Sequence, residues 1–280
     1  MCAADAVRPK LRKDGVDILQ CRRCGLAWWE PGPGVDPAAL YDAGYFASRE
    51  AGVGYDDYAG LEAPLRRTVS ARLSRLGAPA AGERLLDVGA AYGFTSSEAM
   101  RAGWRVAAVE ISREAAARAA GILGRRIVAG SALALPFESG AFSVATLWDV
   151  LEHLPDPHRA ASELRRVLRP GGRLALTTGD VGSAVARLSG RRWHLYTLPE
   201  HLFFYSRESL RRLLAAHGFR VERMAAEASW YPAGYLVERL RKTLLRRAAT
   251  RPARWPGARV PLPVNLFDVV SVTAVREGGA

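Results

Sequence analysis

The stretch that decides the fold is residues 84–99, RLLDVGAAYGFTSSEA, where a short apolar run ends at Asp87-Val88-Gly89 and leads directly into a helical pattern. Glycine permits a sharp turn at Gly89 and lets the backbone at Gly93 approach a ligand closely. In open α/β sheets, ligands bind beyond the carboxyl ends of the strands. The stretch therefore predicts a strand, a ligand-binding loop and a helix.

Short apolar runs alternate with helical patterns beyond this unit. Strands are expected at 84–88, 105–110, 126–130, 141–149, 173–178, 219–227 and 267–276, and helices at 64–76, 95–103, 112–123, 158–168 and 206–218. Alternating strands and helices indicate a parallel sheet with helices on both faces. We predict an α/β fold with a doubly wound, mostly parallel, seven-stranded sheet, a lid segment at the N-terminus and an insertion before the last strand.

The composition limits the class of protein. The chain has 280 residues, of which 49% are hydrophobic and 24% charged, which fits one large or two small domains with an ample core. No run approaches the roughly 18 apolar residues of a membrane span, and the N-terminus lacks the apolar region of a secretory signal. We expect a cytoplasmic protein. The net charge of +12 indicates attraction to anions, unless arginine is simply abundant throughout.

The three cysteines are Cys2, Cys21 and Cys24. In a cytoplasmic protein, the CRRCG sequence at 21–25 is typical of half a metal site rather than of a disulfide. A tetrahedral zinc site needs four ligands, and only Cys2 and Asp5 stand near enough in the sequence to add to the pair. Zinc at the N-terminal cysteines is therefore an open alternative.

The loop after the first strand indicates which ligand it binds. A dinucleotide-binding loop, G-x-G-x-x-G, would need glycine where Ala91 and Phe94 stand, which argues against a nicotinamide cofactor. Glu110 ends the next strand about twenty residues later, where a carboxylate can accept hydrogen bonds from both ribose hydroxyls. An adenosyl ligand without a pyrophosphate fits both features.

At this point the sequence resembles the class I S-adenosylmethionine-dependent methyltransferases, and among them the group that includes the ubiquinone-biosynthesis O-methyltransferases. The resemblance rests on LLDVGAAYG (85–93), VAAVEIS (106–112), GSALALPFESGAFSVATLWDVLEHLPDP (130–157), VLRPGGRLALTT (167–178) and PEHLFFYSRESLRRLLAAHGFRV (199–221). It covers about 84–226 and the closing strand. It implies a Rossmann-like methyltransferase fold with S-adenosylmethionine as cofactor.

The resemblance also implies which residues bind the cofactor. Asp87 is expected to orient the loop, and Glu110 to hold the ribose. The remaining contacts are expected from Gly89, Ala90 and Gly93 on the methionine half, Ile111, Ser131 and Ala132 at the adenine, and Trp148 and Asp149 beside the sulfur. Ser131 departs from the aspartate often found there, but its hydroxyl can still form a hydrogen bond.

Catalysis requires in-line positioning of donor and acceptor, and an oxygen acceptor must also lose its proton. His153 and His201 are the candidate bases, because a histidine with a pKa near neutrality suits this step. The resemblance implies a divalent metal at Asp149, Glu152 and His153, which would lower the pKa of an acceptor oxygen. The alternative is that Glu152 caps local backbone and His153 packs under the strand.

Aromatic residues are expected around the acceptor. Trp193, Tyr196, Phe203 and Phe204 either line the acceptor pocket or pack in the core, and Tyr41, Tyr45, Phe46, Tyr55 and Tyr58 are expected to form a lid over its mouth. Aromatic walls exclude water and favour planar or apolar acceptors. The acceptor is thus expected to be a small molecule of aromatic or lipid-like character.

The connection 228–266 is too long for a hairpin and contains a basic amphipathic helix. Its apolar positions are Leu236, Val237, Leu240 and Leu244, and its basic ones are Arg239, Arg241, Lys242, Arg246 and Arg247. Such a helix either contacts an anionic membrane peripherally or packs on its own domain. Nucleic-acid binding is not expected, because no stacking aromatics alternate with these charges.

These observations divide the chain into an N-terminal lid segment with the cysteines (1–80), a methyltransferase core that binds S-adenosylmethionine (81–227), a basic insertion (228–266) and a closing strand with tail (267–280). The predicted function is methyl transfer to a small molecule, at a hydroxyl oxygen. The alternatives are carbon methylation of a nucleotide-linked sugar, and a catalytically silent partner that binds the adenosyl ligand.

Overall fold

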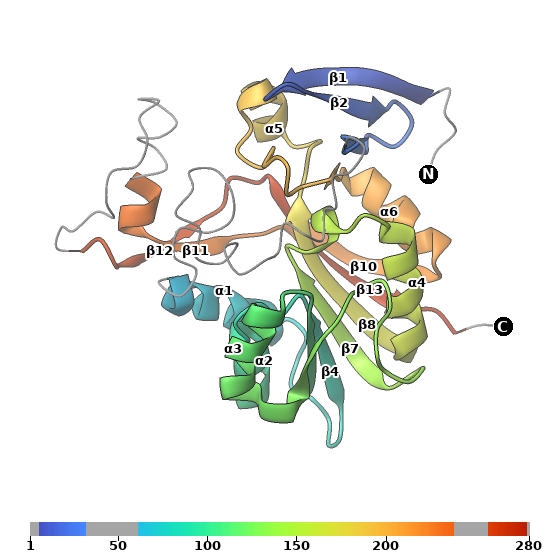
Figure 1. The fold of residues 1–280 in the computed structure, drawn as a ribbon, viewed down its shortest axis with the longest axis vertical. Helices are drawn as coiled ribbons and strands as arrows, with labels where there is room; N and C mark the ends of the chain where they lie inside the picture. The colour runs from blue at the N-terminus through green and yellow to red at the C-terminus, as the bar shows by residue number, and fades with distance from the viewer. Residues whose placement is uncertain (1–5, 32–60, 238–256, 279–280) are drawn as a thin grey trace.

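A seven-stranded sheet forms the centre of the computed structural model, which describes residues 6–31, 61–237 and 257–278 (Figure 1). The strands are β4 (Arg84–Val88), β5 (Arg105–Glu110), β6 (Ile127–Ala129), β7 (Phe142–Trp148), β8 (Leu168–Gly179), β10 (Phe219–Ala226) and β13 (Val269–Arg276). Their order is β10-β13-β8-β7-β4-β5-β6, and β13 pairs antiparallel with both β8 and β10 while the pairs from β8 to β6 are parallel. The predicted doubly wound, mostly parallel sheet is confirmed.

Helices cover both faces of this sheet. They are α1 (Glu62–Ser74), α2 (Phe94–Arg101), α3 (Arg113–Leu123), α4 (Pro157–Val167) and α6 (Arg207–Ala216), while the short α5 (Ala184–Ser189) lies near the N-terminal strands (Figure 1). In Figure 1, α1, α2 and α3 lie on one side of the sheet, and α4 and α6 on the other. Strands covered on both faces are apolar along their length, as in β7, where six of seven residues are buried.

Side-chain caps fix where several helices begin. The Asp156 side chain accepts a hydrogen bond from the Arg159 amide at the start of α4 (2.9 Å). Ser206 caps α6, the helix expected at 206–218. It accepts from the Ser209 amide, and the Ser209 hydroxyl accepts in turn from the Ser206 amide (2.9 Å). Short polar side chains at these positions satisfy backbone donors that the first helical turn leaves open.

A small second sheet joins the N-terminal residues to the core. Strands β1 (Val7–Lys13), β2 (Val16–Cys21) and β3 (Ala27–Trp28) pair in that order, and β3 pairs antiparallel with β9 (Phe203–Phe204) of the core. The Ser206 hydroxyl donates a hydrogen bond to the Cys24 carbonyl. A Cβ at Gly25 would lie 3.1 Å from that hydroxyl oxygen, so glycine permits the close contact. The sequence analysis did not predict this sheet.

The insertion before the last strand begins and ends in a two-stranded ribbon. Strand β11 (Ser229–Pro232) pairs antiparallel with β12 (Pro261–Val264), and the Trp230 amide donates to the Thr68 hydroxyl of α1 (2.9 Å). Residues 233–237 are helical. The basic residues of the predicted amphipathic helix (Arg239, Arg241, Lys242, Arg246 and Arg247), with Leu240 and Leu244, lie outside the described residues, as do the lid aromatics Tyr41, Tyr45, Phe46, Tyr55 and Tyr58. None of the described helices is long and apolar enough to cross a membrane.

Candidate functional site

A pocket of about 240 Å³ opens at the carboxyl ends of β4, β5 and β7. Nine residues predicted to form the site line it: Gly89, Ala90, Glu110, Ile111, Ser131, Ala132, Trp148, Asp149 and His153. They come from four separate segments of the chain, each of which follows a parallel strand. The structure thus gathers most of the predicted site in one cavity at the edge of the sheet where α/β proteins bind ligands.

The loop after β4 is held in a tight turn against β5. The amides of Gly89 and Ala90 both donate to the Val109 carbonyl, at 2.9 and 3.2 Å. Gly89 has a φ of +74°, and a Cβ there would lie 2.5 Å from a methyl of Val150. Both the backbone conformation and the available space therefore require glycine. Ala91 has a φ of +48°, a strained conformation for a residue with a side chain.

Glu110 braces this loop from the end of β5. One of its carboxylate oxygens accepts from the Ala91 amide (2.7 Å) and the other from the Ser112 amide (2.9 Å). Burial raises the pKa of Glu110, and the backbone hydrogen bonds act in the opposite direction. Each carboxylate oxygen has a second lone pair. Glu110 can therefore accept further hydrogen bonds from a ligand in the pocket that it lines.

Asp87, in β4, and Gly93, where the loop meets α2, are not among the lining residues. The Asp87 carboxylate accepts hydrogen bonds from the hydroxyls of Ser96 (2.7 Å) and Thr146 (3.0 Å). Burial raises its pKa to about 6. At Gly93 a Cβ would lie 3.1 Å from Leu123 of α3. These two residues fix the position of the loop relative to α2, β7 and α3.

Helix α1 supplies one wall of the pocket, which the sequence analysis missed. Leu65, Val69 and Arg72 line it, at a spacing that places them on one helical face. The Arg72 guanidinium lies 5.0 Å from the centre of the Trp148 ring, and its Nη1 is 3.6 Å from Oδ2 of Asp149. The sequence predicted a helix at 64–76. The apolar spacing of its residues was the signal that one face packs against another part of the protein.

Asp149 lies where β7 ends, with a φ of +56°. Its amide donates to the Thr177 carbonyl (3.1 Å), and its Oδ1 accepts from the Thr177 hydroxyl (2.9 Å). Its side chain is 50% exposed. Neighbouring β8 therefore holds Asp149 in a strained conformation at the mouth of the pocket, and such strain is found most often at functional positions.

His153 lines the pocket, whereas His201 does not. The two imidazole rings meet edge to face, with centroids 4.6 Å apart. His153 Nδ1 lies 3.1 Å from the Glu200 carbonyl, and His201 Nδ1 lies 2.9 Å from the Leu195 carbonyl. Because a carbonyl only accepts, Nδ1 carries the hydrogen in both rings. Burial lowers the pKa of His153 well below 6.5, and that of His201 to about 4.

The structure groups Glu152 and His153 with His201, and not with Asp149. One ligand atom from each of these three residues lies within 4.8 Å of the others. Burial, together with the charge of Asp149, raises the pKa of Glu152 to about 8. Among the described residues this is the one group of three such side chains close enough to hold a metal ion. Cys21 and Cys24 are buried and form no disulfide, and Cys2 lies outside the described residues.

The aromatic residues expected around the acceptor lie in the core. Trp193, Tyr196, Phe203 and Phe204 are all buried, and none is among the residues that line this pocket. The rings of Trp193 and Tyr196 pack edge to face, with centroids 5.0 Å apart. Of the two alternatives, the burial of these residues supports core packing, and their role as an acceptor wall stays a prediction.

Comparison with known proteins identifies a family. Residues 61–223 match the model of a methyltransferase domain. The ubiquinone biosynthesis O-methyltransferase of Ralstonia nicotianae is 36% identical over 139 residues, which are 46% of this chain and 58% of that protein. The O-methyltransferase resE of Aspergillus sclerotiorum is 31% identical over 167 residues, 56% of this chain and 61% of that protein. An uncharacterized methyltransferase of Mycobacterium sp. strain KMS is 40% identical over 97 residues, 34% of this chain and 38% of that protein.

The chain thus spans about two fifths to three fifths of the length of these relatives. Solved structures share the fold at lower identity. The putative methyltransferase of Haloferax volcanii, solved with the Trm112 methyltransferase activator, has a TM-score of 0.57 at 16% identity and covers 78% of this chain and 93% of its own. The YcgJ protein of Bacillus subtilis has a TM-score of 0.54 at 17% identity and covers 76% of this chain and 100% of its own.

Proposed function

Because this chain belongs to the methyltransferase domain family, we propose that it transfers a methyl group from S-adenosylmethionine to a hydroxyl oxygen of a small molecule. The observation that carries the proposal is the pocket itself, where the glycine loop, Glu110 and the Trp148-Asp149 strand end line one cavity. We call this cavity the donor pocket. Two of the relatives are named O-methyltransferases, which supports oxygen as the acceptor atom.

The residues of the donor pocket fit the parts of S-adenosylmethionine. Glu110 offers acceptor lone pairs to the ribose hydroxyls. Ile111 and Ala132 offer apolar contact to the adenine, and Ser131 adds a hydroxyl beside it. The Arg72 guanidinium complements a carboxylate, such as that of the methionine half. When bound, S-adenosylmethionine supplies an activated sulfonium methyl, and the protein positions the acceptor in line with it.

His153 is the proposed base for the acceptor hydroxyl. Its lowered pKa keeps the imidazole neutral at pH 7, and Nε2 is the basic atom because Nδ1 donates to the Glu200 carbonyl. His201 lies outside the lining and packs against the His153 ring, so we assign it a positioning role. The buried contact fixes the direction in which the His153 ring faces the cavity.

A turnover assay tests this assignment. S-adenosylhomocysteine release is measured with a panel of phenols and catechols, for wild type, His153→Gln and His158→Gln. His158 is the control because it lies on α4, outside the donor pocket. Loss of a general base lowers kcat by about 100-fold or more, while S-adenosylmethionine affinity is retained. Turnover by His153→Gln at the wild-type rate contradicts the role of His153. A wild type that binds the cofactor but turns over no acceptor favours the silent-partner alternative.

A divalent cation at Glu152, His153 and His201 is a second candidate, and one observation favours it. Oε2 of the buried Glu152 has no hydrogen-bond partner in the described structure. Two imidazoles with one carboxylate suit a transition metal better than Mg²⁺. A bound cation would supply a Lewis acid that lowers the pKa of the acceptor hydroxyl. Metal analysis of purified wild type and Glu152→Gln tests this: equal metal content in the two, or none in wild type, contradicts it.

Four other predictions from the sequence stay predictions once the fold is known. Zinc at Cys21 and Cys24 needs further ligands, and the Cys2 that we named for it lies outside the described residues. Peripheral contact with an anionic membrane rests on the basic residues 239–247, which also lie outside. A cytoplasmic location and the division at 80, 227 and 266 stay predictions too.

A further inference from the structure

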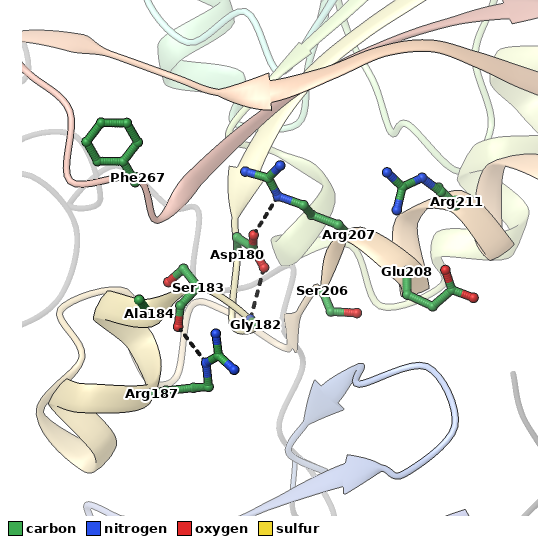
Figure 2. A pocket seen from close by; sticks show the side chains of 10 residues that line it. All are labelled: Asp180, Gly182, Ser183, Ala184, Arg187, Ser206, Arg207, Glu208, Arg211 and Phe267. Atoms are coloured by element: carbon green, nitrogen blue, oxygen red, sulfur yellow. Dashed lines mark hydrogen bonds and ion pairs between the residues drawn. The ribbon is translucent and has the colours of Figure 1, made fainter.

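A second pocket, of about 460 Å³, lies at the same edge of the sheet (Figure 2). Three segments line it: residues after β8 (Asp180, Gly182, Ser183, Ala184 and Arg187), the start of α6 (Ser206, Arg207, Glu208 and Arg211) and Phe267 before β13. It shares no lining residue with the donor pocket. No motif in the sequence pointed to it. We call it the arginine pocket.

The arginine pocket is structurally connected to the donor pocket. Asp149 follows β7 and Asp180 follows β8, and these two strands are neighbours. Between them runs the segment 202–205. Its Leu202 amide donates to the Glu152 carbonyl (2.9 Å), and its Tyr205 carbonyl accepts from the Val181 amide (2.8 Å). One strip of backbone therefore contacts an element of each pocket.

The lining of the arginine pocket has unpaired positive charge. Its two carboxylates are already in ion pairs, Asp180 with Arg207 (2.9 Å) and Glu208 with Arg212 (2.7 Å). Arg187 and Arg211 form no ion pair with a described residue, and both are exposed. Arg207 and Arg211 are four residues apart on α6, which places both on one face of the helix. Arg187 Nε donates to the Ser183 carbonyl (3.4 Å), so the Nη atoms of Arg187 and the guanidinium of Arg211 are available for an anion.

An apolar group lies at the other end of the pocket. Figure 2 shows Phe267 at one end and Arg211 at the other. The Phe267 side chain is 67% exposed and its φ is +59°. A bulky residue in the left-handed region is a true outlier, and this one carries an exposed aromatic ring. Exposed rings beside cationic groups suit a ligand with one apolar end and one anionic end.

We propose that the arginine pocket binds the phosphate or diphosphate group of an amphiphilic molecule, with Arg187 and Arg211 on the oxygens and Phe267 on the apolar part. Guanidinium groups match the geometry of phosphate oxygens and stay charged at all physiological pH values. The molecule is either a soluble phosphorylated metabolite or a phospholipid whose headgroup enters the pocket. Binding does not depend on the proposed methyl transfer.

Calorimetric titration with inorganic pyrophosphate tests the anionic half. Wild type is expected to bind pyrophosphate. The affinity of the double variant Arg187→Gln/Arg211→Gln is expected to be lower by at least about tenfold, because two charge-assisted contacts are lost. The matched control, Arg105→Gln/Arg125→Gln, removes the same charge from exposed positions at the amino ends of β5 and β6. It is expected to bind like wild type. No binding by wild type, or equal loss in both double variants, overturns the proposal.

Two further probes test the proposed contact of Phe267 with the apolar part of the ligand, and distinguish a phospholipid from a soluble metabolite. Phenyl phosphate is expected to bind wild type more tightly than inorganic phosphate, and Phe267→Ser to remove that advantage. Vesicles of phosphatidylglycerol are added to the same proteins. Vesicle binding that the arginine variant loses assigns a phospholipid headgroup, whereas phenyl phosphate preference without vesicle binding assigns a soluble metabolite. If wild type still binds S-adenosylmethionine but shows neither the phenyl phosphate preference nor vesicle binding, the amphiphile assignment is overturned and the proposed function is unaffected.

Discussion

The donor pocket and the arginine pocket open at the same edge of one sheet, yet they are built in different ways. The donor pocket is lined by residues that directly follow β4, β5, β6 and β7, together with one face of α1. The arginine pocket is assembled from residues 180–187, 206–211 and 267, which the chain brings together only after it has folded. A pocket made at strand ends is readable from sequence motifs, and a pocket made between distant segments is not.

The two pockets also differ in their chemistry. Among the described residues, three arginines line the arginine pocket, while the donor pocket is lined by one, Arg72, which lies against Trp148 and Asp149. The donor pocket holds backbone strain in the loop after β4 and at Asp149, and the arginine pocket holds it at Phe267. Variants that affect one pocket and leave the other unchanged therefore test whether the two act as separate sites.

The largest expected effect is that of Gly89→Val in the donor pocket. A Cβ at this position would lie 2.5 Å from Val150, and the φ of +74° adds backbone strain. We expect S-adenosylmethionine affinity to fall by at least about 100-fold, because displaced loop atoms no longer fit the ligand. Pyrophosphate binding at the arginine pocket is expected to stay at the wild-type level.

The control for this variant is Gly121→Ala, which lies in α3 with no atom within 4 Å of the added Cβ. It is expected to raise the free energy of unfolding by about 0.5–1 kcal/mol and to bind S-adenosylmethionine normally. If Gly89→Val binds the cofactor within a few-fold of wild type, the loop does not contact the ligand as we propose.

The second expected effect concerns Asp87 beneath the donor loop. Its pKa rises from 3.8 in the unfolded chain to about 6 in the fold, because burial disfavours the carboxylate. The folded state therefore holds more protons between these values, and this contribution to stability is lost as pH rises from about 4 to 6. The full shift corresponds to about 3 kcal/mol.

Chemical unfolding at pH 4, 5 and 6 isolates this contribution when Asp87→Asn is compared with wild type. The buried histidines of lowered pKa act in the opposite direction in the same pH range, and they contribute equally to both proteins. The stability of Asp87→Asn relative to wild type is expected to increase with pH. A difference that does not change from pH 4 to pH 6 shows that Asp87 is ionised in the fold throughout this range.

The smallest expected effect is that of Ala91→Gly. Ala91 has a φ of +48°, and an alanine in the left-handed region costs roughly 1 kcal/mol that glycine avoids. We expect the variant to be more stable by about that amount, with its cofactor affinity little changed. Thermal unfolding and S-adenosylmethionine titration of the same samples measure both. A loss of stability would mean that the Ala91 side chain contributes packing that outweighs the strain.

The sequence predicted the central sheet because its signals are local. β4 and β5 begin and end where the apolar runs indicated. The sequence did not reveal two-residue strands such as β3 and β9. Each of these two strands depends on pairing with the other, which lies about 175 positions away in the chain. No periodicity can be read from two residues.

The contrast between local sequence signals and long-range contacts also decides which site residues the sequence could predict. Glu110 and Asp149 end strands, so their position followed from the motif, whereas Arg72 required knowledge of where α1 packs. Trp193 and Phe204 show the converse case: aromatic residues near a site are equally suited to the core, so the sequence left both alternatives open, and the structure buries both rings. His201 meets His153 only because the segment 200–205 returns beside Glu152.

Direct titration with S-adenosylmethionine and S-adenosylhomocysteine tests the central claim, that the donor pocket binds an adenosyl methyl donor. Wild type, Glu110→Ala and the control Glu114→Ala, an exposed residue of α3, are compared by calorimetry. We expect micromolar binding by wild type and the control. In Glu110→Ala we expect a loss of at least about tenfold, because a ligand hydrogen bond to a charged group and the hydrogen bond to the Ala91 amide are both removed. Folded wild type that binds neither ligand, or Glu110→Ala that binds both as wild type does, would contradict it.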